Sequence, residues 1–323
     1  MTRISHFIAV CTLAMLGACA TPVPSDPQYG YIDDRNLPKP DFSAKIPGLS
    51  PCTNSKDTTL HLNSHEPVTV IVHGCTGSAA LFRSLAEVFA FHGQQAVCFN
   101  YNDRDSLTQS SAELITALDA LSTKMDNKAM TVIGHSQGGL ISRRALIKER
   151  DNRLQAEQNN LTLVTISTPY AGISAADHCG STTFRWLTLG LAVPICKLVS
   201  GDKWYEITQP SYFIQQPGTL LDQVTRHVKI VTDERGTCRK FDDTGACVED
   251  DHVFNIEEQY FDKVDNIQVV ENLEVDAGHA EIVGDYKVAP DKLIAILQDK
   301  RIMDSTPPEQ QARLAMLLKQ LYQ

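Results

Sequence analysis

The residues with the clearest capacity for chemistry lie in the run GHSQGG that begins at Gly134, where Ser136 stands between two glycines. Residues 130–133 are apolar and largely β-branched and predict a short buried strand, while residues 140–147 carry apolar side chains at helical spacing. A serine on such a tight strand-to-helix turn presents its Oγ at the helix N-terminus. A Cβ at either flanking position would collide with the adjoining strand or helix, which explains Gly134 and Gly138.

A serine hydroxyl at this turn can attack a carbonyl carbon if a base takes its proton and an acid orients that base. The negative charge that then develops on the carbonyl oxygen needs hydrogen-bond donors. The backbone amide of Gln137 points the same way as Ser136 and predicts one such donor. The pattern therefore indicates nucleophilic acyl chemistry.

These residues resemble those of the α/β-hydrolase superfamily, and within it the lipase and esterase branch, where GHSQGG is common. In this fold the chain order is serine, acid, histidine. The resemblance implies that His279, in Gly278-His279-Ala280 after the last predicted strand, is the base. Asp251 lies in a stretch that resembles the acid-bearing D-x-V-V loop of lipases and is the expected acid. Asp233, at a strand end, and Asp250 stay open as alternatives.

The second oxyanion donor comes from the resemblance of His73-Gly74 to the family's His-Gly loop. The resemblance assigns this donor to the backbone amide of Cys75, which makes the expected oxyanion hole Cys75 and Gln137. Cysteine is atypical at this position, but only its amide has to act. Its thiol is interpreted as a small buried group or a disulfide partner.

Predicted strands and helices alternate along most of the chain. The predicted strands are 58–62, 67–72, 95–101, 130–133, 161–166, 228–232 and 266–275, and the predicted helices are 79–91, 106–125, 140–147 and 290–297. Such alternation predicts an α/β fold, with a mostly parallel central sheet and helices on both faces. Sites in these sheets form at the carboxyl ends of strands, where the His-Gly loop and the serine turn would meet.

One segment, residues 173–216, breaks the alternation and is expected to be an inserted cap. Its apolar run Phe184–Cys196 fits a lid lined for an acyl chain and equally fits an ordinary helical insertion packed on the domain. Around it we expect a hydrolase domain over 46–303 and a C-terminal helix over 304–323.

The first residues indicate export. A basic residue and a short apolar run precede Leu16-Gly17-Ala18-Cys19, which resembles the lipobox of bacterial lipoproteins. The expectation is a signal peptide over 1–18, lipidation of Cys19 and a tether over 19–45. An ordinary secretory signal is the alternative. Because Ala20 rather than aspartate follows the cysteine, the outer membrane of a bacterial envelope is the expected location.

The sequence has nine cysteines, and setting aside Cys11 and Cys19 leaves seven in the exported part. Export makes disulfides the default, and an odd number leaves one thiol unpaired. The expected pairs are Cys238 with Cys247, which flank a turn-rich centre, and Cys179 with Cys196 in the insertion. Among Cys52, Cys75 and Cys98 the sequence does not decide; our preference pairs Cys52 with Cys98 and leaves Cys75 free.

Composition excludes several classes. The net charge of −10 with no basic cluster argues against nucleic acid as a partner. The chain lacks the H-E-x-x-H, paired C-x-x-C and P-loop patterns, so no cofactor or metal is expected, with a calcium ion in the acidic stretch 242–251 as the open alternative.

The sequence thus predicts a serine hydrolase that cleaves carboxylic esters, in particular lipid-like ones. Acyl transfer or thioester cleavage by the same three residues is the first alternative. An inactive envelope binding protein on the same fold is the second.

Overall fold

The structure is a computed structural model that describes residues 32–33, 35–75, 77–150, 154, 160–176, 201–285 and 288–322. The expected signal peptide, the expected lipidation site Cys19 and the expected Cys179–Cys196 pair lie outside these residues. Within the described ranges, no helix is both long and apolar enough to cross a membrane.

A seven-stranded sheet forms the centre of the molecule, in the order β11-β8-β7-β6-β4-β5-β2. Its strands are β2 (Leu49–Ser50), β4 (Val68–Val72), β5 (Gln95–Phe99), β6 (Ala129–His135), β7 (Asn160–Ile166), β8 (Val224–Asp233) and β11 (Val270–Asp276). All neighbours pair in parallel except β2, which runs antiparallel to β5 at the edge. The carboxyl ends of the six parallel strands therefore all lie at the same end of the sheet.

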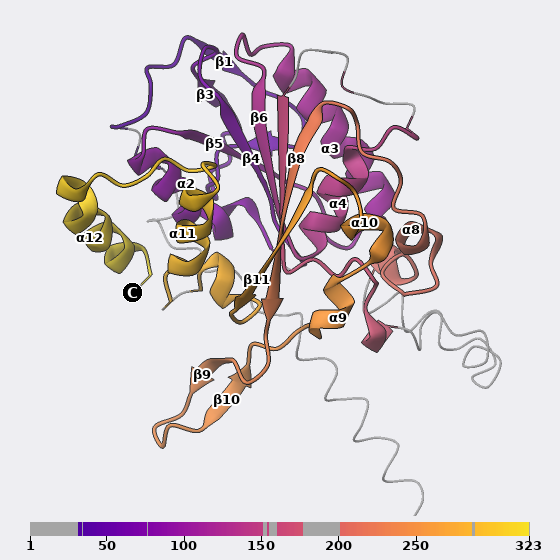
Figure 1. Cartoon of the computed structure of the whole chain (residues 1–323). Coiled ribbons are helices and arrows are strands. Elements are labelled where there is room, and N and C mark those ends of the chain that lie inside the picture. The colour runs from indigo at the N-terminus through magenta and orange to yellow at the C-terminus, as the bar shows by residue number, and fades with distance from the viewer. Residues whose placement is uncertain are drawn as a thin grey trace, which may run out of the picture.

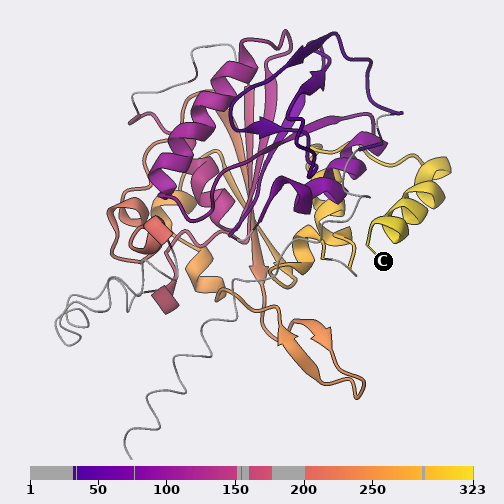
Figure 2. The same cartoon turned by 180° about the vertical axis from the view of Figure 1, so that it is seen from behind.

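Helices cover both faces of the sheet (Figures 1 and 2). One face carries α2 (Arg83–Phe91) and α11 (Asp291–Asp299), with α12 (Gln311–Leu321) outside them, and the other carries α3 (Leu107–Ser122) and α4 (Gln137–Ala145). The predicted fold class, a mostly parallel sheet between two helical layers, is confirmed.

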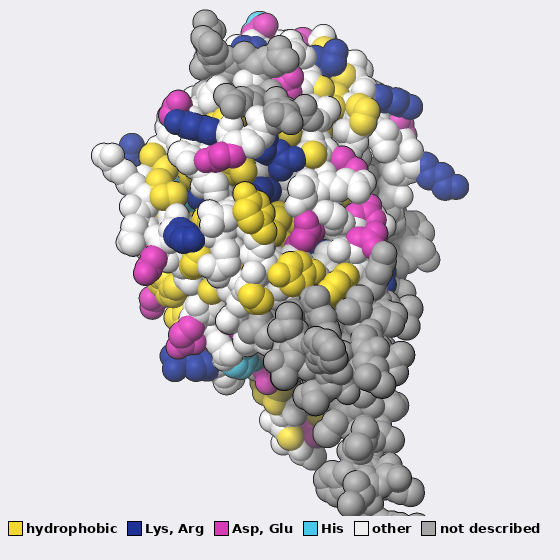
Figure 3. All heavy atoms as spheres, turned by 90° about the vertical axis from the view of Figure 1, so that its right-hand side faces the viewer, with side chains coloured by type: hydrophobic (Ala, Val, Ile, Leu, Met, Phe, Trp, Pro, Cys, Tyr) yellow, Lys and Arg dark blue, Asp and Glu magenta, His cyan; other side chains and the backbone are white. Residues whose placement is uncertain are grey.

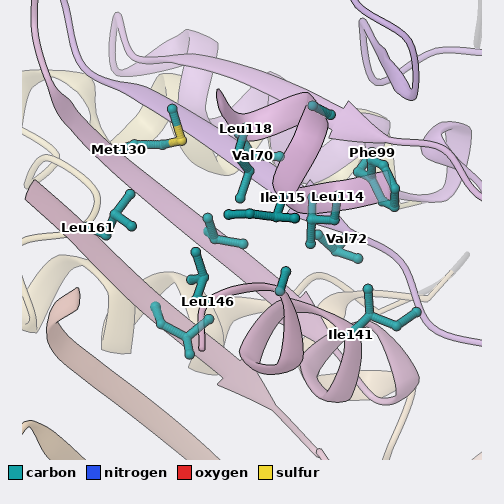
Figure 4. Close-up of a cluster of buried hydrophobic side chains, with 14 of the residues drawn as sticks. Val70, Val72, Phe99, Leu114, Ile115, Leu118, Met130, Ile141, Leu146 and Leu161 are labelled. Carbon is teal, nitrogen blue, oxygen red and sulfur yellow. The ribbon is translucent and has the colours of Figure 1, made fainter. Parts of the chain in front are cut away.

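The buried side chains form one cluster on each face of the sheet. Figure 4 shows the cluster under α3 and α4, where Leu114, Ile115 and Leu118 of α3 pack over Val70 and Val72 of β4. Strands buried on both faces need continuous apolar runs, and β4 is buried at every position. This packing holds the strand ends that carry the candidate site.

Shorter elements complete the described structure. They are β1 (Phe42–Ala44), β3 (Leu60–Leu62), β9 (Cys238–Phe241), β10 (Cys247–Asp250), α8 (Tyr212–Gln215), α9 (Ile256–Gln259), α10 (Asp262–Asp265) and the 3-10 turns Ala79–Phe82, Ser174–Ala176, Gly201–Trp204, Glu281–Val283 and Pro308–Gln310. The strands β9 and β10 form a hairpin that projects from the carboxyl-end side of the sheet (Figure 1). The face that carries α8 and α10 mixes hydrophobic with charged side chains (Figure 3).

The structure corrects the expected tether over 19–45 at its end. Residues Phe42–Ala44 pair in antiparallel register with β3, so they belong to the folded part of the chain. Asp41 strengthens this attachment, because its carboxylate accepts hydrogen bonds from the amide and the hydroxyl of Ser64. Such side-chain contacts leave no signal in a local pattern of apolar residues.

Two disulfides lie in the described residues, and both agree with the sequence expectation. Cys52 pairs with Cys98 and Cys238 pairs with Cys247. Cys75 is in no disulfide, as preferred. The first bridge joins the segment after β2 to the neighbouring strand β5 and is buried, whereas the second closes the exposed hairpin.

The two bridges should differ in their contribution to stability. Cys52–Cys98 spans 46 residues and Cys238–Cys247 spans 9, and a longer closed loop restricts the unfolded chain more. We expect the double variant Cys52→Ala/Cys98→Ala to lower the free energy of unfolding in urea by about 2–4 kcal/mol. The matched variant Cys238→Ala/Cys247→Ala should lower it less; an equal or larger loss there would contradict this account.

Candidate active site

The turn that carries Ser136 has the geometry expected of a nucleophile elbow. Strand β6 ends at His135 and helix α4 begins at Gln137, and Ser136 between them has a φ of 55° and a ψ of −124°. A Cβ on Gly134 would lie 2.5 Å from the carbonyl oxygen of Gly138, and one on Gly138 would lie 2.3 Å from that of Val72. Side chains at these positions are therefore excluded, and the positive φ of the serine is held by its surroundings.

The His-Gly loop after β4 lies directly beside this turn. A Cβ on Gly74 would lie 3.0 Å from the Cβ of Ser136. Tyr101 holds this loop through two contacts. Its hydroxyl donates to the carbonyl oxygen of His73 at 2.7 Å, and its ring stacks on the His73 ring with centroids 4.3 Å apart. Cys75 follows in the same loop, so the structure brings both predicted oxyanion-donor segments to the side of Ser136.

His279 reaches the same place from the loop after β11. Its carbonyl oxygen lies 3.0 Å from Nε2 of His135, the residue before Ser136, and the two imidazole rings have centroids 4.7 Å apart. The ring of Phe254 packs edge-on against the His279 ring, with centroids 4.9 Å apart. The predicted base therefore lies at the elbow, 143 residues after the serine in sequence.

The carboxylate that faces the His279 ring belongs to Glu234, immediately after β8. Its Oε1 lies 2.9 Å from Nδ1 of His279, and its side chain has no exposed surface. Since a carboxylate accepts, Nδ1 is assigned the proton, which leaves Nε2 free to take one. This is the orientation that a base for Ser136 requires.

Hydrogen bonds from three directions satisfy the buried Glu234 carboxylate. Thr232 Oγ1 donates to Oε1 at 2.9 Å, and the amides of Val253 and Phe254 donate to Oε2 at 2.6 and 2.8 Å. Burial raises the pKa of Glu234, but the hydrogen bond and charge of His279 and the two amides outweigh it, so the net shift of that pKa is downward. Glu234 is therefore held in its charged form.

The expectation that Asp251 orients the histidine ring is wrong. Its carboxylate instead accepts the backbone amides of Ala280 and Glu281, both at 2.9 Å, and its carbonyl accepts the amide of His279 at 3.0 Å. Burial raises the pKa of this carboxyl. Asp251 thus fixes the backbone of the histidine loop, while the ring is oriented by Glu234.

The two alternative acids do not contact the ring either. Asp233 pairs with Arg235, whose hydrogen bond lowers the pKa of this carboxyl to about 2, and Asp250 accepts the amide of the exposed His252. Successive side chains at a strand end point to opposite sides, so Asp233 points outward where Glu234 points inward. Two consecutive acids, Asp233 as the last residue of β8 and Glu234 directly after it, are the sequence signal that points to this strand end, and packing decides which of the two faces the ring.

No cluster of three or more histidine, cysteine or acidic side chains that could hold a metal ion occurs among the residues the structure describes. The exposed acidic residues of the hairpin are used locally instead: Asp242 accepts from Thr244 and Ala246, and Glu249 pairs with Arg239. The chemistry that the described site can perform is that of its serine, imidazole, carboxylate and backbone amides.

The chain is similar to known proteins in sequence and in fold. The sequence model of the palmitoyl protein thioesterase family matches residues 67–217, which include the His-Gly loop and the elbow. A comparison with curated protein sequences gives no match.

The fold is similar to that of solved hydrolases. The Bacillus licheniformis lipase BlEst2 in its propeptide form has a TM-score of 0.52 at 16% identity, covering 83% of this chain and 55% of that one. Its mature form has a TM-score of 0.49 at 16% identity, over 81% and 98%. A putative cell surface hydrolase from Lactobacillus plantarum has a TM-score of 0.41 at 14% identity, over 79% and 98%. The chain therefore has the α/β-hydrolase fold, a mostly parallel sheet between two helical layers, which it shares with the BlEst2 lipase.

Proposed function

We propose that the protein is a serine hydrolase that cleaves acyl esters through an acyl-enzyme on Ser136. Nε2 of His279 takes the proton of Ser136 as its Oγ attacks the carbonyl carbon, and Glu234 stabilises the imidazolium that forms. The amides of Cys75 and Gln137 donate to the oxyanion. His279 then gives the proton to the leaving alcohol, and a water molecule activated by the same base releases the acid and restores Ser136.

The observation that carries this proposal is the pairing of His279 with Glu234 beside the strained Ser136. Burying a carboxylate costs free energy unless it is fully hydrogen-bonded, and Glu234 has four donors for that purpose. A serine with a positive φ is likewise an unfavourable conformation that persists only where surrounding contacts impose it. Both features together favour catalysis over an inactive binding protein.

A thioester substrate is the second candidate, and the family match favours it. The matched family acts on palmitoyl protein thioesters by its name, and residues 67–217 include the elbow and the His-Gly loop. Thioester cleavage uses the same steps, with a thiol in place of the alcohol as leaving group. Acyl transfer differs only in replacing the final water by another nucleophile.

Replacing Ser136 tests the proposed nucleophile. We expect Ser136→Ala to lower kcat for p-nitrophenyl butyrate at least about a thousandfold, because the remaining groups cannot form the acyl-enzyme. Palmitoyl-CoA hydrolysis should fall equally if one serine serves both substrates. The ratio of kcat/KM for p-nitrophenyl palmitate and palmitoyl-CoA in the wild type then decides between ester and thioester. Activity of Ser136→Ala near the wild-type level would refute the mechanism.

Replacing Glu234 tests the assigned acid. Glu234→Gln keeps the size of the side chain but presents an amide that can reverse the tautomer of His279, so kcat should fall by about 10²–10⁴-fold. The neighbouring Asp233→Asn is the matched control and should change kcat by less than about twofold, since its carboxylate pairs with the exposed Arg235. Loss of activity in Asp233→Asn with retention in Glu234→Gln would reverse the assignment.

We further propose that the protein is a lipoprotein of the bacterial outer membrane, anchored through Cys19. The support is the lipobox-like Leu16-Gly17-Ala18-Cys19, and several acyl chains would give stable anchoring. Cells that express the wild type should incorporate radiolabelled palmitate into the protein and retain it in outer-membrane fractions. Cys19→Ser should lose the label; an unlabelled wild type released from the cells would support an ordinary secretory signal instead.

A further inference from the structure

A buried lysine lies next to the candidate active site and has no part in the mechanism above. Lys203 is carried by the 3-10 turn Gly201–Trp204, in the last part of the expected insertion 173–216, and only 4% of its surface is exposed. Its ammonium group donates to Oε1 of Gln137 at 2.5 Å, to Sγ of Cys75 at 3.3 Å and to the carbonyl oxygen of Asp103. Its three N–H groups thus have three acceptors.

Two of these acceptors belong to the residues whose amides are the proposed oxyanion donors. Gln137 begins α4 directly after Ser136, and Cys75 lies in the His-Gly loop. The Gln137 side chain also donates to the carbonyl oxygen of Asp103 at 3.1 Å, which closes a network around the ammonium. The ammonium group of Lys203 therefore bridges the elbow and the His-Gly loop, the two segments that form the expected oxyanion hole.

Other contacts already attach residues 201–206 to the rest of the domain. The amide of Asp202 already donates to the carbonyl oxygen of Arg104 at 2.7 Å. The carboxylate of Glu206 accepts from the amide of Leu107 and the hydroxyl of Thr108, at the start of α3. An apolar side chain at 203 would fill the same space without the cost of removing a charge from water.

We propose that Lys203 is a positioning residue for the oxyanion hole. It holds the Gln137 and Cys75 segments at a fixed separation, and its charge lies in a water-poor site where it favours the negative charge of the transition state. This inference rests on the proposed function, since it assigns Lys203 a role in the acylation of Ser136. Lys203 itself does not touch the reacting atoms.

The test compares Lys203→Met, which removes the charge at similar length, with Lys203→Arg, which keeps the charge. Lys128→Met is the matched control. The ammonium of Lys128 also donates to backbone carbonyls, those of Ser122 and Met125, but Lys128 directly precedes β6 and so lies at the opposite end of that strand from the site.

Rates for p-nitrophenyl butyrate are divided by the number of serines that a fluorophosphonate titrates, so that misfolded protein does not contribute. We expect Lys203→Met to lower kcat about ten- to a hundredfold with KM changed by less than about threefold, and Lys203→Arg to recover part of the loss. Lys128→Met should keep the wild-type kcat.

The double variant Lys203→Met/Gln137→Met separates positioning from a general structural effect. If the lysine acts through the Gln137 side chain, the two losses in kcat are not multiplicative. Should Lys203→Met fail to fold, Gln137→Met breaks the same contact from the other side, keeps the backbone amide and should also lower kcat. A wild-type kcat in Lys203→Met, or in Gln137→Met where Lys203→Met does not fold, overturns the role of Lys203 while leaving the proposed function intact. A wild type that neither hydrolyses the ester nor is titrated overturns both.

Discussion

The buried contact between Glu234 and His279 sets the requirement on which the rest of the site depends. A carboxylate with no exposed surface persists in its charged form only if donors surround it. Those donors come from β8 through Thr232, from the loop before α9 through Val253 and Phe254, and from His279 itself. The hairpin β9–β10, which the Cys238–Cys247 disulfide closes, lies in sequence between Glu234 and Val253. The carboxylate and the two amides that donate to it are therefore separated in sequence by the whole hairpin.

The parallel sheet explains why residues so distant in sequence meet. The carboxyl ends of β4, β6, β8 and β11 lie on one edge, and they deliver the His-Gly loop, Ser136, Glu234 and His279 respectively. The site also needs a close approach between backbones: because Gly134 and Gly138 have no side chains, α4 can pack against β4. Asp251 holds the backbone that presents His279.

The sequence predicted the parts of this arrangement that have a local cause. The elbow follows from a β-branched run, two glycines and a helical repeat, and the mostly parallel sheet between helices follows from the alternation of strands and helices. The identity of the acid that orients His279 cannot be read from local sequence, because spacing alone allows any of four residues: Asp233, Glu234, Asp250 and Asp251. Only the packing of β8 against its neighbours decides which carboxylate is buried beside the ring. Lys203 was missed for the same reason, since its acceptors lie 66, 100 and 128 residues away in sequence.

In the proposed mechanism, the Glu234–His279 pair activates Ser136. The most direct measurement is reaction of the purified protein with a fluorophosphonate, followed by digestion and mass spectrometry to locate the adduct. We expect one adduct per chain on the peptide that contains Ser136, because an active serine phosphonylates far faster than an ordinary hydroxyl. A chain that stays unmodified, or one modified at another residue such as Cys75 or Ser167, would contradict it.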